Sequence, residues 1–197
     1  MREAAPRYGN LTFEEYLAIE ASSDVRHEFV AGTLYAMACA SRRHARIAWN
    51  IAAALTPSAR DYGCDVLISD MLVRVGESIA YYPDVSVVCD PDDANERYAE
   101  RPCLIVEITS PSSEERDQRE KLIGYRGIAS LQTYLVVFQH ESRVIHYQRT
   151  STGSWTRLDL IGEGIIQLSC PPMELSLNDI YSRVTFDPSE PSTSEPQ

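Results

Sequence analysis

The residues best suited to chemistry are an acid at the start of one apolar run and an acid inside the next. Asp84 opens the run DVSVVC after Pro83, and Glu107 lies within LIVEIT. An ionised carboxylate among apolar neighbours is costly unless it is paired or binds a metal ion. If the two runs are adjacent strands, their acids can meet, and at about 4 Å they would repel by roughly 4 kcal/mol. A divalent cation removes that repulsion, so we expect a site for Mg²⁺, with Mn²⁺ as a substitute.

The segment after Glu107 is expected to form a helix that supplies an amine. Asp117, Lys121 and Tyr125 are spaced i, i+4, i+8, so they share one helical face. A lysine near the cation can orient the attacking water or neutralise charge in the transition state. We therefore predict in-line hydrolysis of a phosphodiester, with Asp84, Glu107 and Lys121 as the catalytic residues.

Each of these residues also has a simpler interpretation. Asp84 after proline could cap a turn, and Glu107 could form a structural ion pair with an arginine. Lys121 could lie on a solvated helix face, or pair with Asp117 in a surface bridge of about 0.3–0.5 kcal/mol. Tyr125 could pack in the core with a polar tip. The occurrence of Asp84, Glu107 and Lys121 in this order favours the catalytic interpretation.

Hydrophobic periodicity predicts a mixed α/β sheet flanked by helices. A T-x-x-E capping box at Thr12 opens a helix through about Glu20, and a second helix covers 44–55, with Pro57 just beyond it. A third helix is expected from 112 to about 126, and a last short segment at 177–181 packs back. The predicted strands are 26–30, 33–37, 64–69, 71–75, 84–89, 104–109, 133–138, 143–148 and 155–160.

Length and composition favour one domain, at 11–186, between a flexible N-terminus (1–10) and a disordered tail (187–197). The net charge of -11 argues against a protein that coats DNA through a broad basic surface. It does not exclude a nuclease, because a metal ion and a few basic side chains can hold a backbone. The basic segment 42–46 could contact phosphates or be ordinary helix-surface charge.

Cysteine usage and hydropathy indicate a soluble cytoplasmic protein. The five cysteines are scattered among apolar residues without a C-x-x-C pair. We expect reduced, buried thiols, with neither a disulfide framework nor a zinc site. No signal peptide is apparent, and no apolar stretch reaches the roughly 18 residues that a membrane span requires.

The chain resembles the Uma family of restriction-endonuclease-like proteins, within the PD-(D/E)XK nuclease superfamily. The matching stretches include RHEFVAGTLYAM, SRRHARIAWNIAAAL, YYPDVSVVCDP, LIVEITSPSSEERDQREKLIGYR and ELSLNDIY, and they cover most of 11–181. The resemblance implies a restriction-endonuclease-like core with Asp84 and Glu107 as metal carboxylates. Thr109 stands in the slot that E-x-K motifs give to lysine, so the resemblance implies that Lys121 is the migrated catalytic lysine.

The resemblance also extends to residues outside the central motif. Glu28 matches an acidic position of the family and is a further candidate metal ligand. His44 and Tyr125 match family positions and are possible accessory residues, as is Asp117 on the face of Lys121. Alone, Glu28 could equally be a solvent-facing strand residue and His44 a capping or packing residue.

These patterns and the resemblance predict a Mg²⁺-dependent endonuclease that cuts DNA. A homodimer is expected, because a single site cuts only one strand. One alternative is a catalytically inactive nucleic-acid- or protein-binding member of the fold, which Thr109 and the acidic charge favour. Another is a metal hydrolase acting on a small phosphoester or nucleotide.

Overall fold

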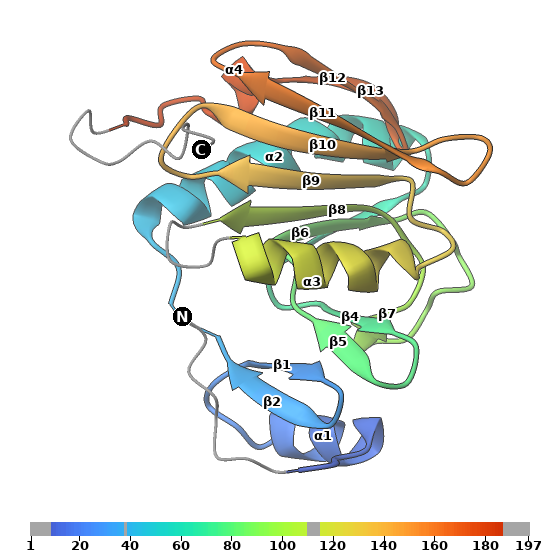
Figure 1. Ribbon diagram of the computed structural model, residues 1–197. Coiled ribbons are helices and arrows are strands. Elements are labelled where there is room, and N and C mark those ends of the chain that lie inside the picture. Colours follow the sequence, from blue (N-terminus) through green and yellow to red (C-terminus); the bar gives the residue numbers. More distant parts are fainter. Residues whose placement is uncertain (1–8, 38, 110–114, 187–197) are drawn as a thin grey trace.

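The central element of the computed structural model is a six-stranded sheet (Figure 1). The structure describes residues 9–37, 39–109 and 115–186. The strand order is β11-β10-β9-β8-β6-β3, with β8 and β9 parallel and the other pairs antiparallel. The strands are β3 (Asp65–Ile68), β6 (Val85–Val88), β8 (Pro102–Thr109), β9 (Thr133–Phe138), β10 (Arg143–Arg149) and β11 (Trp155–Ile161). The predicted mixed sheet is confirmed.

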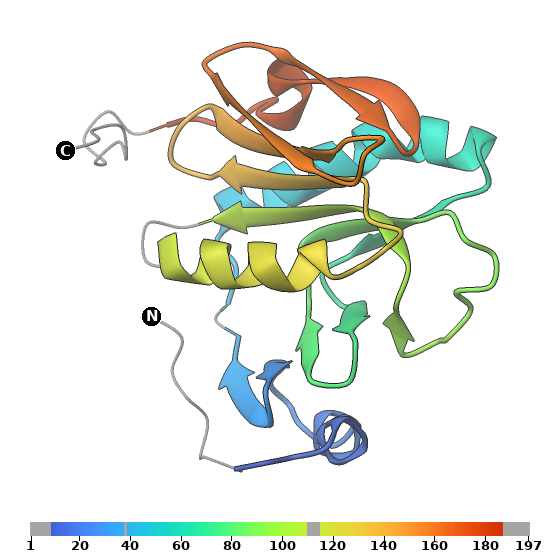
Figure 2. The ribbon, with the colours of Figure 1, turned by 45° about the vertical axis from the view of Figure 1, so that its right-hand side comes forward.

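Two helices cover opposite faces of this sheet, α2 (Arg42–Asp61) on one side and α3 (Glu115–Arg126) on the other (Figures 1 and 2). All eight residues of β8 are buried. Its Val106 and Ile108 belong to the hydrophobic cluster that includes α2, whereas Ile105 joins Tyr125 of α3 in a second cluster. Alternate residues of β8 therefore face opposite sides of the sheet, and Glu107 lies on the α3 face.

A second sheet carries the N-terminal part of the chain, below the central sheet in Figure 1. Its order is β2-β1-β5-β4-β7, and α1 (Phe13–Glu20) packs on it through a cluster that contains Phe13, Tyr16 and Phe29. The predicted capping box of Thr12 and Glu15 is confirmed. The strands are β1 (His27–Val30), β2 (Thr33–Ala36), β4 (Leu72–Val75), β5 (Ile79–Tyr81) and β7 (Tyr98–Ala99).

Some element boundaries differ from the prediction. Helix α2 continues through Pro57 to Asp61, because Leu55 and Ala59 extend its buried face and packing outweighs the backbone hydrogen bond that proline lacks. The sequence analysis also missed β5, β7 and the hairpin of β12 (Ile165–Ser169) and β13 (Pro172–Ser176). These strands are short, and short strands carry little periodic signal.

The prediction of reduced cysteines is wrong for this structure. Cys64 is joined to Cys89, and Cys103 to Cys170, while Cys39 is free and exposed. The cause is strand register, which a linear reading of the spacing does not reveal. Pairing of Asp65 with Val88 sets Cys64 opposite Cys89, and pairing of Val88 with Pro102 brings Cys103 to the same end of the sheet.

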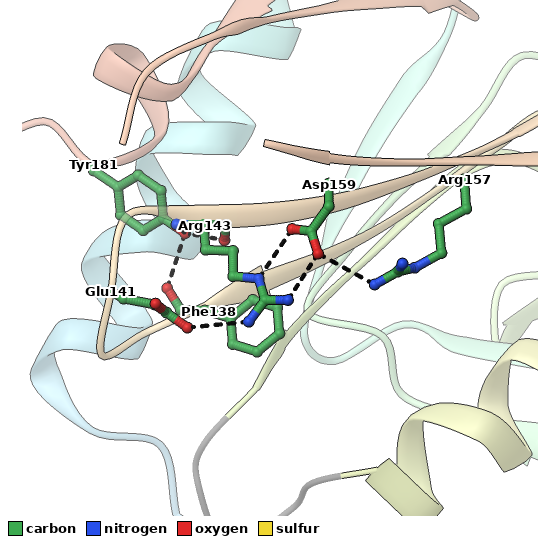
Figure 3. Close-up of polar contacts among 6 residues, drawn as sticks. All are labelled: Phe138, Glu141, Arg143, Arg157, Asp159 and Tyr181. Carbon is green, nitrogen blue, oxygen red and sulfur yellow. Dashed lines mark hydrogen bonds and ion pairs between the residues drawn. The ribbon is translucent and has the colours of Figure 1, made fainter. Parts of the chain in front are cut away.

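A polar network fixes α4 (Leu177–Ile180) and the residue after it to the turn between β9 and β10 (Figure 3). The hydroxyl of Tyr181 lies 2.9 Å from the carbonyl oxygen of Phe138 and 2.6 Å from that of Arg143, and it accepts from the backbone N–H of Arg143 at 3.1 Å. The Arg143 guanidinium donates hydrogen bonds to both carboxylate oxygens of Asp159, at 2.9 and 2.7 Å. The 177–181 segment therefore packs back as predicted.

The Tyr181→Phe variant should be destabilised by about 1–3 kcal/mol, because it leaves a part-buried N–H and carbonyl groups without their partner. Urea unfolding followed by circular dichroism measures the change. Tyr62→Phe is the matched control, since Tyr62 is 61% exposed. Equal stability of Tyr181→Phe and the unmodified chain would contradict this role.

The expected flexible N-terminus and disordered tail fall largely on 1–8 and 187–197, which lie outside the described residues, as does the expected helix start at 112. Within the described ranges, no helix combines the length and apolar character needed to cross a membrane.

Candidate functional site

Glu107 stands on the α3 face of β8, near the strand's C-terminal end. Its side chain is held from two positions of α3. The Tyr125 hydroxyl donates to Oε1 at 2.6 Å, and the Lys121 ammonium donates to Oε2 at 2.8 Å. One helical turn separates these donors, so the helix presents both to the same carboxylate. Lys121 and Tyr125 thus lie on the shared face that their spacing predicts.

Lys121 connects two acids that come from different sheets. Its Nζ lies 2.7 Å from Glu28 Oε1 and 2.8 Å from Glu107 Oε2, and its side chain is only 12% exposed. Glu28 belongs to β1 and is itself buried. The ammonium also lies 5.5 Å from the centre of the Tyr81 ring, within cation–π range. Lys121 is therefore a buried cation, not part of a solvated helix face.

Asp84 lies beside Glu107, as the strand prediction required. β6 pairs with β8 through Val85 and Val106, so the register brings the preceding Asp84 next to Glu107. The backbone N–H of Ile108 donates to Asp84 Oδ2 at 2.6 Å. This contact fixes the carboxylate at the end of β8.

His44 approaches Asp84 from the first turn of α2. Its Nε2 lies 3.1 Å from Asp84 Oδ1, so each oxygen of this carboxylate has a contact within the described residues. The helix begins at the Ser41 cap, whose side chain accepts from the His44 backbone N–H. Helix capping therefore fixes the backbone of His44 in the first turn of α2.

The electrostatics of the site are dominated by an excess of negative charge. Burial raises the pKa of Glu107 to about 7; Lys121 opposes the rise, and the charges of Asp84 and Glu28 add to it. Burial lowers the pKa of Lys121, but Glu107 and Glu28 more than compensate, so the pKa is raised and the amine stays protonated. One ammonium thus faces three carboxyl groups.

The neighbouring groups respond to the same charges. Burial lowers the pKa of His44, but its hydrogen bond to Asp84 and the charges of Asp84 and Glu107 leave that pKa above the ordinary value. Burial and the Glu107 charge raise the pKa of Tyr125 well above its usual range. Tyr125 is therefore a neutral hydrogen-bond donor to Glu107 near neutral pH.

Six of the seven predicted site residues gather in one cluster: Asp84, Glu107, Lys121, Glu28, His44 and Tyr125. The seventh, Asp117, belongs to α3, but its side chain lies outside the described residues. Glu107 pairs with a lysine and not with an arginine, and Glu28 is buried, not solvent-facing. Thr109, in the usual lysine slot, is buried at the end of β8.

The sequence analysis overlooked one signal and two contacts. Lys121 is the single lysine among 18 lysine and arginine residues. A chain that uses arginine at every other basic position, and lysine here, indicates a need for a compact ammonium and not a planar guanidinium. The Tyr81 ring beneath Lys121 and the Ile108 N–H that holds Asp84 were also overlooked, because neither carries a sequence pattern.

Comparison with known proteins yields one family model and several relatives. The model of the Uma2 family, described as "Putative restriction endonuclease", matches residues 13–178. Two uncharacterized proteins of Synechocystis sp. (strain ATCC 27184 / PCC 6803 / Kazusa) are similar. Protein sll1609 is 34% identical over 157 residues, 78% of this chain and 89% of that protein. Protein slr1290 is 29% identical over 181 residues, which are 91% of this chain and 95% of that protein.

A solved structure shares the fold. It is the crystal structure of "a putative nuclease belonging to DUF820" from Anabaena variabilis ATCC 29413, with a TM-score of 0.70 and 16% identity. The match covers 89% of this chain and 99% of the other. This likeness confirms the predicted restriction-endonuclease-like fold class.

Proposed function

The chain belongs to the Uma2 family, and from that membership we propose that it is a divalent-cation-dependent endonuclease that hydrolyses phosphodiester bonds in DNA. The observation that carries the proposal is the buried amine of Lys121, which contacts Glu107 directly while Asp84 lies immediately before the adjoining strand β6. Thr109 leaves the usual lysine position without an amine. The lysine from α3 supplies that amine from another direction.

Asp84 and Glu107 suit a hard divalent cation such as Mg²⁺ or Mn²⁺. A carboxylate offers about four lone-pair directions, so oxygens with one contact each among the described residues retain capacity for a cation. The three acids exceed the charge of Lys121, and a cation would offset that excess. Mg²⁺ prefers one or two carboxylates together with waters and phosphate oxygens. Asp84 and Glu107 are the proposed ligands, with Glu28 as a further ligand beside Lys121.

The remaining side chains have distinct parts in hydrolysis. When bound, the cation would supply Lewis-acid stabilisation of the charge that develops on the phosphate oxygens. Lys121 adds a second positive charge at the same carboxylates and can orient the attacking water. Tyr125 and the Ile108 N–H hold Glu107 and Asp84 in place. His44, beside Asp84, is placed to receive or donate a proton.

The proposed substrate is DNA in the cytoplasm, bound by a homodimer. Arg42 and Arg46 lie in the first turns of α2, as His44 does, and the N-terminus of this helix favours anions such as phosphate. These groups supply local positive charge on a chain whose net charge is -11. A dimer would present two such sites and could cut both strands.

The proposal is tested by incubating the purified chain with plasmid, linear duplex, single-stranded DNA and free nucleotides. We expect cleavage of DNA with Mg²⁺ or Mn²⁺ and none when a chelator is present. Turnover of nucleotides alone would identify a small-phosphoester hydrolase instead. Absence of cleavage by folded protein with either cation would overturn the assignment.

A second candidate function is binding without catalysis. The ion pairs of Lys121 with Glu28 and Glu107 already stabilise the acids, as a purely structural network would. Calorimetry with Mg²⁺ and Mn²⁺ separates the two functions. Heat of cation binding that disappears in Asp84→Asn favours the nuclease, whereas an intact fold without such heat favours the binding protein.

A further inference from the structure

Four of the five cysteines converge at the end of the sheet opposite the candidate functional site. Cys89 follows β6 and Cys103 is the second residue of β8, whereas Asp84 and Glu107 lie toward the other ends of these strands. Cys64 precedes β3, and Cys170 lies in the turn between β12 and β13. This end of the sheet is where β8 begins, on the right in Figure 1. The fold thus gathers four sulfur atoms from four separate segments.

The two disulfides form one cluster. Cys89 Sγ lies 3.4 Å from Cys170 Sγ and 3.6 Å from Cys103 Sγ, although neither is its disulfide partner. The sulfur atoms of these three residues all lie within 4.8 Å of one another. The fourth sulfur, of Cys64, is bonded directly to Cys89. Backbone register, and not the disulfides alone, brings three of the residues together, since Cys64 and Cys89 flank the paired strands β3 and β6 and Cys103 lies in β8 beside β6.

We propose that this four-cysteine cluster, once reduced, binds one Zn²⁺ through four thiolates. Structural zinc sites are tetrahedral with Zn–S distances of about 2.3 Å, which sets neighbouring sulfurs about 3.8 Å apart. The separations of 3.4 and 3.6 Å between non-bonded sulfurs are already close to that value. Thiolates also select zinc over the hard cations that carboxylates prefer.

Reduction must precede binding, and a dithiol supplies the electrons. Each disulfide takes two electrons and two protons from one dithiol, which becomes a cyclic disulfide, so two dithiols yield four protein thiols. Binding of one Zn²⁺ by four thiolates then releases up to four protons. No other reactant is required.

The surroundings of the cluster suit a structural metal. Cys64 and Cys103 are 8% and 5% exposed and belong to the hydrophobic cluster that includes α2, with Cys89 and Cys170 packed against it. Zinc would keep the β12–β13 hairpin tied to β3, β6 and β8 in a reducing compartment, where disulfides are rare. This inference is independent of the proposed nuclease activity.

The experiment uses the full chain, reduced with a dithiol without oxygen and desalted with a chelator, so that all five cysteines titrate as thiols. Titration with Co²⁺ should give one equivalent per chain, the visible bands of tetrahedral cobalt and a sulfur-to-cobalt charge-transfer band. Zn²⁺ should displace the cobalt and leave one rapidly titrating thiol, that of Cys39. Zn²⁺ should also raise the melting temperature of the reduced chain.

Cys39→Ser is the matched control, because Cys39 is exposed and outside the cluster, and it should leave the cobalt spectrum unchanged. Cys170→Ser and Cys103→Ser should each lose the four-sulfur spectrum. Five free thiols in folded protein without a charge-transfer band would overturn the proposal, and so would a spectrum that survives both cluster substitutions. The spectrum of the unmodified chain decides the matter even if a variant fails to fold.

Discussion

The Glu107→Gln variant is expected to lose DNA cleavage by about a thousandfold or more while remaining folded. Cation stabilisation of the transition state amounts to several kcal/mol, and each 1.4 kcal/mol or so is a tenfold change in rate. Glutamine keeps the length of the side chain, and its single amide oxygen can still accept from Tyr125 or from Lys121. It lacks the charge that would bind the cation. Initial rates of plasmid nicking under single-turnover conditions measure the loss.

Two further variants are needed to interpret this loss of activity. Asp84→Asn should lose activity to a similar extent, because it removes the other proposed ligand but can still accept from the Ile108 N–H. Glu163→Gln, in the exposed turn between β11 and β12, is the matched control and should cleave like the unmodified chain. Full activity in either Glu107→Gln or Asp84→Asn would contradict the cation site.

Glu107→Gln should also change how stability depends on pH. The pKa of Glu107 is about 7 in the fold, raised by burial from an ordinary value of 4.5. A raised pKa means that the folded chain takes up the proton more readily than the unfolded chain. The contribution of Glu107 to stability is therefore full below pH 4.5 and is lost as pH rises toward 7. The free energy of unfolding of Glu107→Gln, relative to that of the unmodified chain, should therefore increase from pH 4.5 to about pH 7 and stay constant above it.

The core of the site could be predicted because it depends on local patterns. Two apolar runs imply neighbouring strands, period-two alternation sets the face of Glu107, and helical spacing aligns Lys121 with Tyr125. These inferences need no long-range information beyond strand pairing. They correctly bring together three side chains of the cluster, those of Asp84, Glu107 and Lys121.

The features that the sequence patterns did not predict depend on contacts between distant segments of the chain. Glu28 reaches Lys121 from a different sheet, and nothing within the RHEF segment indicates that approach; the family resemblance alone pointed to it. The cysteine cluster likewise follows from the register of β3, β6 and β8, which sequence spacing does not encode. The continuation of α2 through Pro57 follows from tertiary packing of Leu55 and Ala59. Each of these features is decided by tertiary structure and not by local propensity.

The Lys121→Met variant is expected to be less stable by about 3–5 kcal/mol, the usual consequence of removing one partner from a buried ion pair. Methionine matches the unbranched stem of lysine but leaves Glu28 and Glu107 buried without the cation between them. The free energy of unfolding in urea, without divalent cations, measures the change. Cleavage activity should fall as well, by about a hundredfold, since a positive charge at the phosphate is lost.

A double variant separates charge from packing in this result. Glu107→Gln introduced into Lys121→Met removes the acid that had lost its partner and should recover part of the stability, giving a coupling energy of about 1–3 kcal/mol. Arg60→Met is the control, because Arg60 lies at an exposed position of helix α2, and its effect should stay within about 0.5 kcal/mol. If Lys121→Met is as stable as the unmodified chain, Lys121 is not the ion that holds the two carboxylates together. The amine would then contribute to neither the fold nor the proposed chemistry in the way that its position between Glu28 and Glu107 requires.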